Sequence, residues 1–296
     1  MKKMTKKQII NLICNILMVI FFLISISCLI YPIIFDTVNR QEQHRTIVSY
    51  DNRLSGMDED EKATLLAEAE EYNARLRNEH FRITQTDEKL DDYLSRFNVG
   101  SNGVMGHLSI PVIDVSLMIY HTVDEPVLQV AVGHLPGTAF PIGGLGNHTV
   151  LSGHRGLTTA ALFTDLDKLE IGDVFYIYVM EDILTYEVDQ IKSVLPDETD
   201  DLEPDPNQDY CTLLTCTPYG VNSHRLLVRG HRVETPEGLY QKDGEYGTYI
   251  LEEPETTKTG LPMEKIMAVL GGILLIGEGA VLTAGLIKKK RNKKQN

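Results

Sequence analysis

At residues 211–233 the sequence reads CTLLTCTPYGVNSHRLLVRGHRV. Two short runs within it, Cys211–Thr215 and Arg225–Val233, are rich in Leu, Val and Thr, and the segment between them contains Pro, Gly and Asn. This composition is typical of two β-strands joined by a turn. If the two strands are neighbours, the guanidinium of Arg225 comes back beside the thiol of Cys216, which stands where the first strand ends.

Short β-branched runs of the same kind recur upstream. Gly, Pro and Asp separate them, and one segment among them, Thr158–Leu169, has the pattern of a helix. Seven or eight short strands without long intervening helices predict a single mostly-β domain, a barrel or a sandwich, over residues 105–235. The other predicted strands are Leu108–Ile110, Val115–Tyr120, Thr149–Ser152, Val174–Met180 and Leu184–Val194.

The segment before this domain, residues 36–104, is predicted to be helical. Asp58 followed by Glu61 has the spacing of a helix N-terminal cap, and a helix over residues 57–78 would begin there. A second short helix is predicted near Lys89–Phe97. Residues 79–104 are polar and irregular, and we expect them to be a connector or a flexible cover, so that residues 36–104 together form a helical, lid-like segment.

Two apolar runs flank these parts. Residues 16–35 carry no charge, residues 266–287 contain one acid, Glu278, and each run is long enough to cross a bilayer as a helix. The first run could instead be a cleaved signal peptide, but its apolar residues continue past Ser25-Ile26-Ser27, which favours an uncleaved anchor. The tails at residues 1–15 and 288–296 are basic, so the positive-inside rule places both termini in the cytoplasm. Residues 236–263 are then an external tether that leads back to the membrane.

The charge of the part predicted to lie outside the membrane is strongly acidic. Residues 36–263 hold 40 acidic and 17 basic residues, a net charge of −23. A nucleic-acid-binding domain needs a basic face, so we expect no nucleic acid as a partner. The seven acids within residues 197–209 could bind calcium, although a solvated acidic loop is commoner. We predict no cofactor and no metal.

Two of the four cysteines, Cys211 and Cys216, lie in the predicted external part. Their offset of five residues places them on opposite faces of a strand, so we expect no disulfide between them and a buried core position for Cys211. Free thiols outside the cell are more often either selected against or put to use. Cys216, at a strand end, suits attack on a bound carbonyl, and Arg225 would favour its thiolate or stabilise an oxyanion.

A cysteine nucleophile also needs a group that carries protons, normally a histidine. Two of the nine histidines are candidates: His154, which follows a predicted strand between Gly153 and Gly156, and His148, at the head of the same strand. Either could instead be an ordinary surface or capping histidine. A metal site made of His148, His154 and Cys216 is conceivable, but no closely spaced pair of ligands supports it.

These residues together resemble the signature of the sortases, membrane-anchored cysteine transpeptidases of Gram-positive bacteria. The likeness is carried by Thr212-Leu213-Leu214-Thr215-Cys216, by Arg225 downstream and by Ser152-Gly153-His154-Arg155-Gly156 upstream, and it runs from about Gly106 to Val233. Two spans with a C-terminal anchor resemble the class C, pilin-polymerising branch in particular.

The resemblance implies an eight-stranded β-barrel on the outer face of the cell membrane. It also implies that Cys216 is the nucleophile, His154 the general acid and base, and Arg225 the group that stabilises the oxyanion or the substrate. Such an enzyme cleaves a sorting signal of the Leu-Pro-x-Thr-Gly type between Thr and Gly and holds the acyl chain as a thioester. In class C enzymes a lysine amine of the next pilin subunit then resolves the thioester.

One departure from the class C pattern concerns the lid before the barrel. Class C members often carry an Asp-Pro-aromatic tripeptide there, but residues 73–104 contain no Asp-Pro, and the nearest likeness is Asp91-Asp92-Tyr93. A lid could use Phe81 or Tyr93 instead, although we favour ordinary packing of these aromatic residues.

Three other functions compete with pilin polymerisation. The chain could be a housekeeping sortase that anchors proteins to the cell wall, or a cysteine hydrolase with the same three residues. It could also be a sorted surface protein, because Leu261-Pro262-Met263 precedes an apolar run and a basic tail, but Glu264-Lys265 stands where Thr-Gly would be required.

Overall fold

The computed structural model describes residues 5–77, 79, 86–100, 102–157, 160–236 and 239. The second predicted span at 266–287 lies outside the described residues, as do the basic tail 288–296, Phe81 and almost all of the tether. The domain boundaries predicted in those parts therefore stay predictions.

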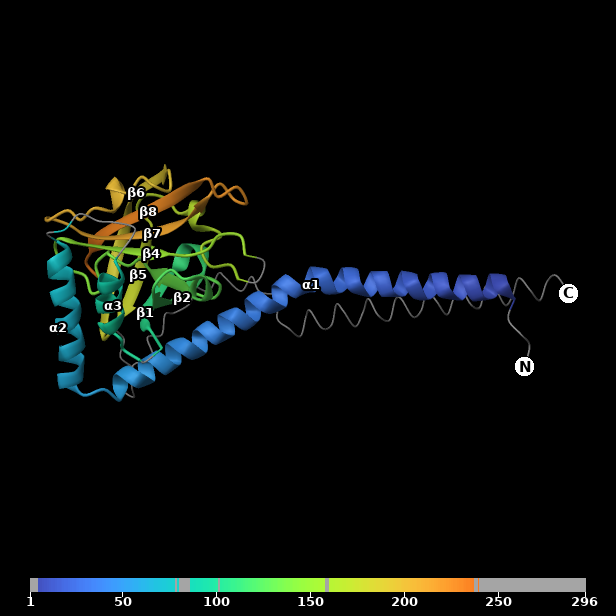
Figure 1. Ribbon diagram of the computed structural model, residues 1–296, viewed down its shortest axis with the longest axis horizontal. Helices are drawn as coiled ribbons and strands as arrows, with labels where there is room; N and C mark the ends of the chain where they lie inside the picture. The colour runs from blue at the N-terminus through green and yellow to red at the C-terminus, as the bar shows by residue number, and fades with distance from the viewer. Residues whose placement is uncertain are drawn as a thin grey trace. The chain divides into compact units, whose positions relative to one another are not determined.

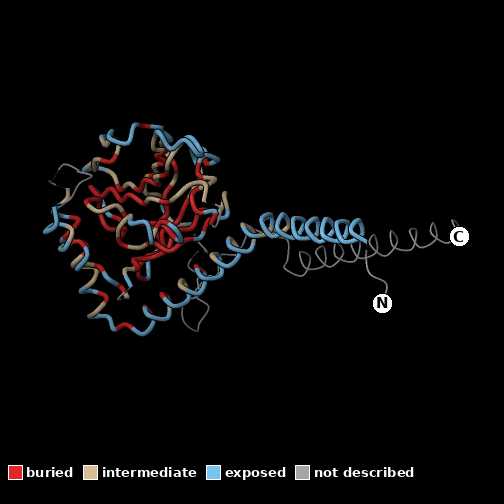
Figure 2. The backbone as a smooth tube through the Cα atoms, turned by 45° about the vertical axis from the view of Figure 1, so that its right-hand side comes forward, coloured by how far each residue is buried: buried red, intermediate tan, exposed pale blue. Residues whose placement is uncertain are grey.

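The first predicted span belongs to a single long helix, α1, which runs over Lys6–Ser55. Within the described residues it is the one helix long and apolar enough to cross a membrane. Its apolar portion is exposed along its length, as the pale blue tube in Figure 2 shows. The helix does not stop where the apolar run ends, and it continues to Ser55, through the first part of the segment 36–104 that was predicted as a separate helical, lid-like segment.

The second half of α1 runs along the β-domain (Figure 1), and polar contacts fix it there. The Gln43 side chain donates to the Val130 carbonyl at 2.7 Å and accepts from the Met118 amide at 2.8 Å. Further along, the Tyr50 hydroxyl donates to the Met105 carbonyl at 3.0 Å and accepts from the Met180 amide at 2.9 Å. The helix that leaves the apolar run is thus part of the domain's own structure.

The β-domain is a closed eight-stranded barrel with the order β1-β2-β3-β4-β7-β8-β6-β5 (Figure 1). This confirms the barrel and rules out the sandwich, because one sheet closes on itself. Side chains such as Leu108, Ile119, Leu213 and Val228 fill its interior and are fully buried. The strands are β1 Val104–Ile110, β2 Val115–His121, β3 Val132–His134, β4 Asn147–Ser152, β5 Val174–Val179, β6 Asp182–Val194, β7 Asp209–Thr217 and β8 His224–Val233.

β3 is the strand that the sequence patterns did not predict. It has three residues, Val132, Gly133 and His134, which is too short to show alternation. Its glycine is required by a close approach, since a Cβ at Gly133 would collide with the carbonyl oxygen of Thr122.

Two helices before the barrel confirm the predicted helical segment. In α2, Glu59–Leu76, the Asp58 side chain accepts from the Glu61 amide at 2.7 Å, as the capping pattern predicted. In α3, Asp87–Ser95, the side chain of Tyr93 is 1% exposed. Its hydroxyl lies 3.0 Å from His134 Nδ1 and accepts from the Thr122 amide at 3.1 Å. Tyr93 therefore packs in the core, as the favoured interpretation has it.

The predicted helix at Thr158–Leu169 is wrong. In the part of it that the structure describes, the chain makes turns and one short 3-10 helix, Leu166–Lys168. Leu162 adopts a φ of 39°, in the left-handed region that interrupts a right-handed helix. Phe163 is fully buried beside Gly153, where an added Cβ would lie 2.7 Å from the Phe163 ring. The packing of this irregular loop against the end of β4, and not the helical pattern, therefore decides its structure.

A four-residue helix that was not predicted, α4, spans Glu125–Leu128.

Candidate active site

The β7–β8 hairpin places Cys216 opposite Arg225, because the two residues are partners in its antiparallel register. Cys216 is half-buried, whereas Cys211 on the same strand is fully buried and both thiols are free. Burial raises the pKa of the Cys211 thiol well above its ordinary value, so this thiol stays protonated and inert. The predicted division between one core cysteine and one accessible cysteine is confirmed.

His154 is brought to the same end of the barrel by the parallel pairing of β4 with β7. Ser152 is the partner of Leu214, and the Gly153 amide donates to the Leu214 carbonyl at 3.1 Å. The Thr215 hydroxyl in turn donates to the Gly153 carbonyl at 2.7 Å. These two hydrogen bonds continue the pairing of β4 with β7 beyond the last residue of β4. His154, the next residue after Gly153, therefore lies beside the end of β7 that carries Cys216.

The other histidine candidate, His148, lies at the opposite end of β4. It pairs in register with Tyr210, is buried, and has Nε2 2.7 Å from the Thr212 hydroxyl and Nδ1 3.1 Å from the Glu203 carbonyl. Burial lowers the pKa of His148 to about 4, so it is neutral. Its position separates it from His154 and Cys216, and the three residues do not gather into a metal site.

The imidazole of His154 faces a carboxylate that no sequence pattern selects. Nε2 of His154 lies 3.3 Å from Oε2 of Glu125, the first residue of α4. Because Glu125 precedes His154 by 29 residues and lies on an unpredicted helix, no spacing rule could have found it. On the other side, the Phe163 amide donates to the His154 carbonyl at 3.1 Å and closes the loop.

The guanidinium of Arg225 is held by the turn that leads into β8. Its Nη1 donates to the His224 carbonyl at 3.1 Å and to the Asn222 carbonyl at 3.4 Å. Among the described residues no carboxylate forms an ion pair with it, whereas Arg229 on the same strand is paired bidentately with Asp189. The charge of Arg225 is thus available to an anion beside Cys216.

The acidic loop at residues 197–209 uses its side chains within the protein. Asp201 binds Lys192 Nζ at 2.6 Å, and Glu198 accepts from the Leu195 amide at 2.9 Å. Within the described ranges, no group of three His, Cys, Asp or Glu side chains could hold a metal ion.

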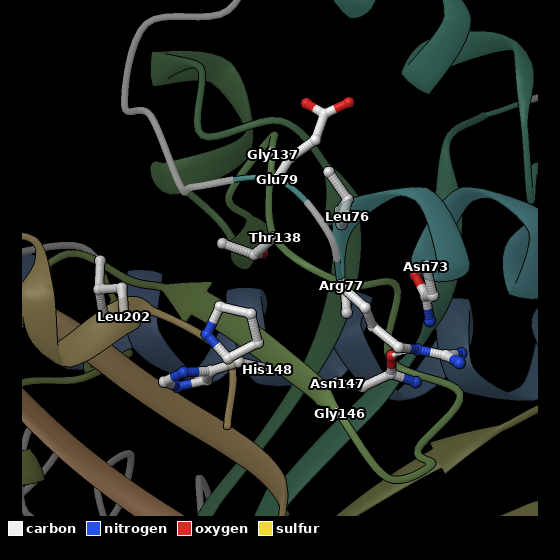
Figure 3. Close-up of a pocket in the computed structure, with 12 residues that line it drawn as sticks. Asn73, Leu76, Arg77, Glu79, Gly137, Thr138, Gly146, Asn147, His148 and Leu202 are labelled. Carbon is white, nitrogen blue, oxygen red and sulfur yellow. Dashed lines mark hydrogen bonds between the residues drawn. The ribbon is translucent and has the colours of Figure 1, made fainter. Parts of the chain in front are cut away.

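Figure 3 shows a small cavity at the far end of β4, where Arg77 of α2's C-terminal end meets Asn147, with His148 nearby. Arg77 Nε donates to Asn147 Oδ1 at 3.0 Å. The cavity has a volume of about 20 Å³, room for about one water. It lies away from Cys216 and is too small to be a peptide site.

Comparison with known proteins identifies the family. The Sortase domain model matches residues 108–233. The chain is 45% identical to the crystal structure of sortase C1 from Streptococcus agalactiae, with a TM-score of 0.63, over 65% of this chain and 100% of that one. It is 39% identical to a Streptococcus pneumoniae sortase C described in terms of catalysis and pilin substrate specificity, with a TM-score of 0.58, over 64% of this chain and 97% of that one.

A curated relative, sortase A of Bacillus anthracis, is 33% identical over 136 residues, which are 45% of this chain. This match spans 61% of that relative's length. The likeness is greater to the solved sortase C1, whose whole length the chain covers. The chain therefore belongs to the sortase family of cysteine transpeptidases.

Proposed function

We propose that this protein is a membrane-anchored class C sortase that joins pilin subunits, with Cys216, His154 and Arg225 as its catalytic residues. The observation that carries the proposal is the strand register, which gathers all three residues at one end of the barrel. The likeness to solved sortases C supports the class, and the apolar first part of α1 supports the membrane anchor.

The first half of the reaction transfers the substrate's acyl group to the enzyme. The Cys216 thiolate attacks the Thr carbonyl carbon of a Leu-Pro-x-Thr-Gly signal, and the guanidinium of Arg225 stabilises the oxyanion that forms. When the Thr–Gly bond breaks, His154 donates a proton to the departing Gly amine. The product is a thioester between the Thr carbonyl and Cys216.

The second half transfers the acyl group to the acceptor. A lysine amine of the next pilin subunit attacks the thioester, His154 accepts the amine's proton, and the Cys216 thiolate leaves. The new bond is an amide between Thr and the lysine side chain. Water must be kept from the thioester, since otherwise hydrolysis would release the free acid.

To test this function, the full chain is incubated in detergent micelles with a Leu-Pro-x-Thr-Gly peptide, and the mass of the protein is followed by mass spectrometry. We expect an added mass on Cys216 equal to the acyl fragment, which disappears when an amine such as a pilin lysine peptide is added. An enzyme that releases acid at the same rate with and without amine would instead be a hydrolase.

A second candidate function is cell-wall anchoring, because several curated relatives of this chain are named sortase A. The two functions differ in the acceptor amine. Competition between a lysine-containing pilin domain and a cell-wall peptide amine for the same thioester distinguishes them, and we expect the pilin lysine to be preferred.

Substitution of Arg225 by lysine tests whether catalysis needs only a positive charge at this position or also the shape of the guanidinium group. We expect Arg225→Lys to lower kcat about 100-fold, because a lysine keeps the charge but lacks the planar fork that aligns two donors. Arg229→Lys is the matched control, since Arg229 lies on the same strand but is paired with Asp189. Equal activity of Arg225→Lys and the natural enzyme would contradict the role of Arg225.

A further inference from the structure

One contact joins the active-site region to the helix that emerges from the apolar run. Asp36 is the first charged residue after residues 16–35, and its Oδ1 accepts from the Ala161 amide at 2.9 Å. Ala161 belongs to the loop after β4, of which residues 153–157 and 160–163 are described and are here called the His154 loop. The bond from the Phe163 amide to the His154 carbonyl closes this loop. The loop that carries the catalytic histidine thus rests on α1 where the apolar run ends.

Contacts further along α1 give the orientation of the barrel on the helix. Asn39 and Gln43 both donate to the Val130 carbonyl, at 3.4 and 2.7 Å. Tyr50 contacts Met105 and Met180. At 1.5 Å per residue, Tyr50 lies about 21 Å beyond Asp36 along the helix. The His154 loop and Val130 therefore mark the end of the barrel near the apolar run.

Cys216 and Arg225 lie at this same near end. Ser152, the last residue of β4, is the partner of Leu214, so the C-terminal ends of β4 and β7 coincide. The turn after β7 also contacts the His154 loop, because a Cβ at Gly156 would lie 2.9 Å from the Tyr219 ring. The catalytic end of the barrel is thus the end nearest the apolar run.

Three of the side chains exposed at this end suit a lipid surface, although the carboxylates of Glu125 and Asp114 are exposed there too. Tyr219 is 60% exposed, Val221 69% and Val130 43%. A tyrosine has an apolar ring and a polar hydroxyl, and such residues are favoured at the interface between lipid and water.

We infer that α1 is a strut, with Pro32 near the end of its apolar run, that holds the catalytic end of the barrel against the lipid surface, within about one helical turn of the membrane boundary. The inference rests on the proposed function, because it takes residues 16–35 to be the membrane anchor. The enzyme then acts on sorting signals that are themselves held at the membrane surface, a few residues from their own span.

A change in strut length tests this. Seven helix-forming residues, Ala-Glu-Ala-Ala-Lys-Ala-Ala, are inserted between Phe35 and Asp36 of the full chain in lipid vesicles. The insertion lifts the barrel by about 10 Å and preserves its facing, because seven residues make nearly two complete turns. We expect turnover of a signal attached to a membrane-spanning helix to fall at least tenfold, with turnover of the soluble signal peptide unchanged within twofold.

The same insertion between Lys7 and Gln8 is the control, since it lengthens the cytoplasmic end of α1 and leaves the barrel in place. Equal loss with both insertions, or undiminished turnover of the membrane-held signal after the Phe35–Asp36 insertion, would overturn the inference. Absence of turnover of the soluble peptide by the natural enzyme would count against the proposed function instead.

A measurement without activity tests the position directly. A fluorophore is attached to Val130→Cys or to Leu145→Cys, each in a chain where Cys14, Cys28 and Cys216 are serine. Both positions are exposed, but Leu145 lies just before β4 begins, at the opposite end of the barrel. We expect lipids brominated near the headgroup to quench the Val130 label at least threefold more than the Leu145 label. Equal quenching of the two labels would refute the strut.

Discussion

Replacing Cys216 with alanine is expected to lower turnover of a sorting peptide by at least about a thousandfold, because the other three thiols lie in the first part of α1 or in the barrel core, away from Arg225. Cys216 is half-buried at the end of β7, and alanine fits there without a large cavity. The melting temperature should therefore stay within about 2 °C of the natural value. Steady-state turnover and circular dichroism of the same preparation measure both quantities.

Cys211→Ala gives the matched control on the same strand. Its thiol is fully buried, so the substitution should cost about 1 kcal/mol of unfolding free energy and leave turnover within a fewfold. Persistent thioester formation by the Cys216→Ala protein, or its loss in Cys211→Ala with the fold intact, would refute the assignment of the nucleophile.

Mild acid is expected to destabilise the barrel through its buried histidines. Burial lowers the pKa of His107 and of His134 to about 3 and that of His148 to about 4, from an ordinary value of 6.5. The unfolded chain therefore binds more protons than the folded chain below pH 6.5. The stability is fully present above pH 6.5 and is lost as the pH falls from 6.5 towards 3.

The expected loss is large on the scale of protein stability. At pH 5 each of the three histidines costs about 2 kcal/mol, or about 6 kcal/mol together, against a typical total of about 5–15 kcal/mol. Burial also raises the pKa of Asp51 to about 6, and this carboxyl offsets about 1 kcal/mol of the loss at pH 5. Urea unfolding at pH 7.5 and at pH 5 measures the difference.

His107→Phe is a variant that isolates one histidine. His107 stacks on Tyr178 with ring centroids 4.3 Å apart, and its buried Nδ1 has no hydrogen-bond partner among the described residues. Phenylalanine keeps the stacking and removes both the titrating group and the unsatisfied nitrogen. The loss between pH 7.5 and pH 5 should shrink by about 2 kcal/mol, and an unchanged pH dependence would contradict this account.

The sequence patterns succeed where one local rule decides the outcome. Seven of the eight strands, the cap at Asp58 and the opposite faces of Cys211 and Cys216 follow from alternation and spacing within a few residues. The alternation of residues predicted either a barrel or a sandwich. The likeness to sortases was needed to predict the closed barrel. The placement of Arg225 opposite Cys216 also follows from a short hairpin.

The patterns fail where tertiary packing decides. The helical pattern at Thr158–Leu169 gives way to a loop because Phe163 fills the space over Gly153. β3 forms because it fits between β2 and β4, and not because three residues have a strand pattern. Glu125 meets His154 only through the position of α4. Such contacts form only in the assembled barrel, and no regular spacing of residues in the sequence indicates them.

The two strand pairings that build the site also differ in how far apart they lie along the chain. The β7–β8 hairpin is local, whereas the bond between Gly153 and Thr215 joins residues 62 positions apart. Since closing a long loop costs more entropy than closing a short one, we expect β7 and β8 to gain amide-exchange protection before β4 during folding. Cys216 would then meet its arginine early and its histidine last. On the proposed assignment of roles, a chain newly delivered across the membrane would carry its nucleophile without its base, and catalysis would begin only when the barrel has closed.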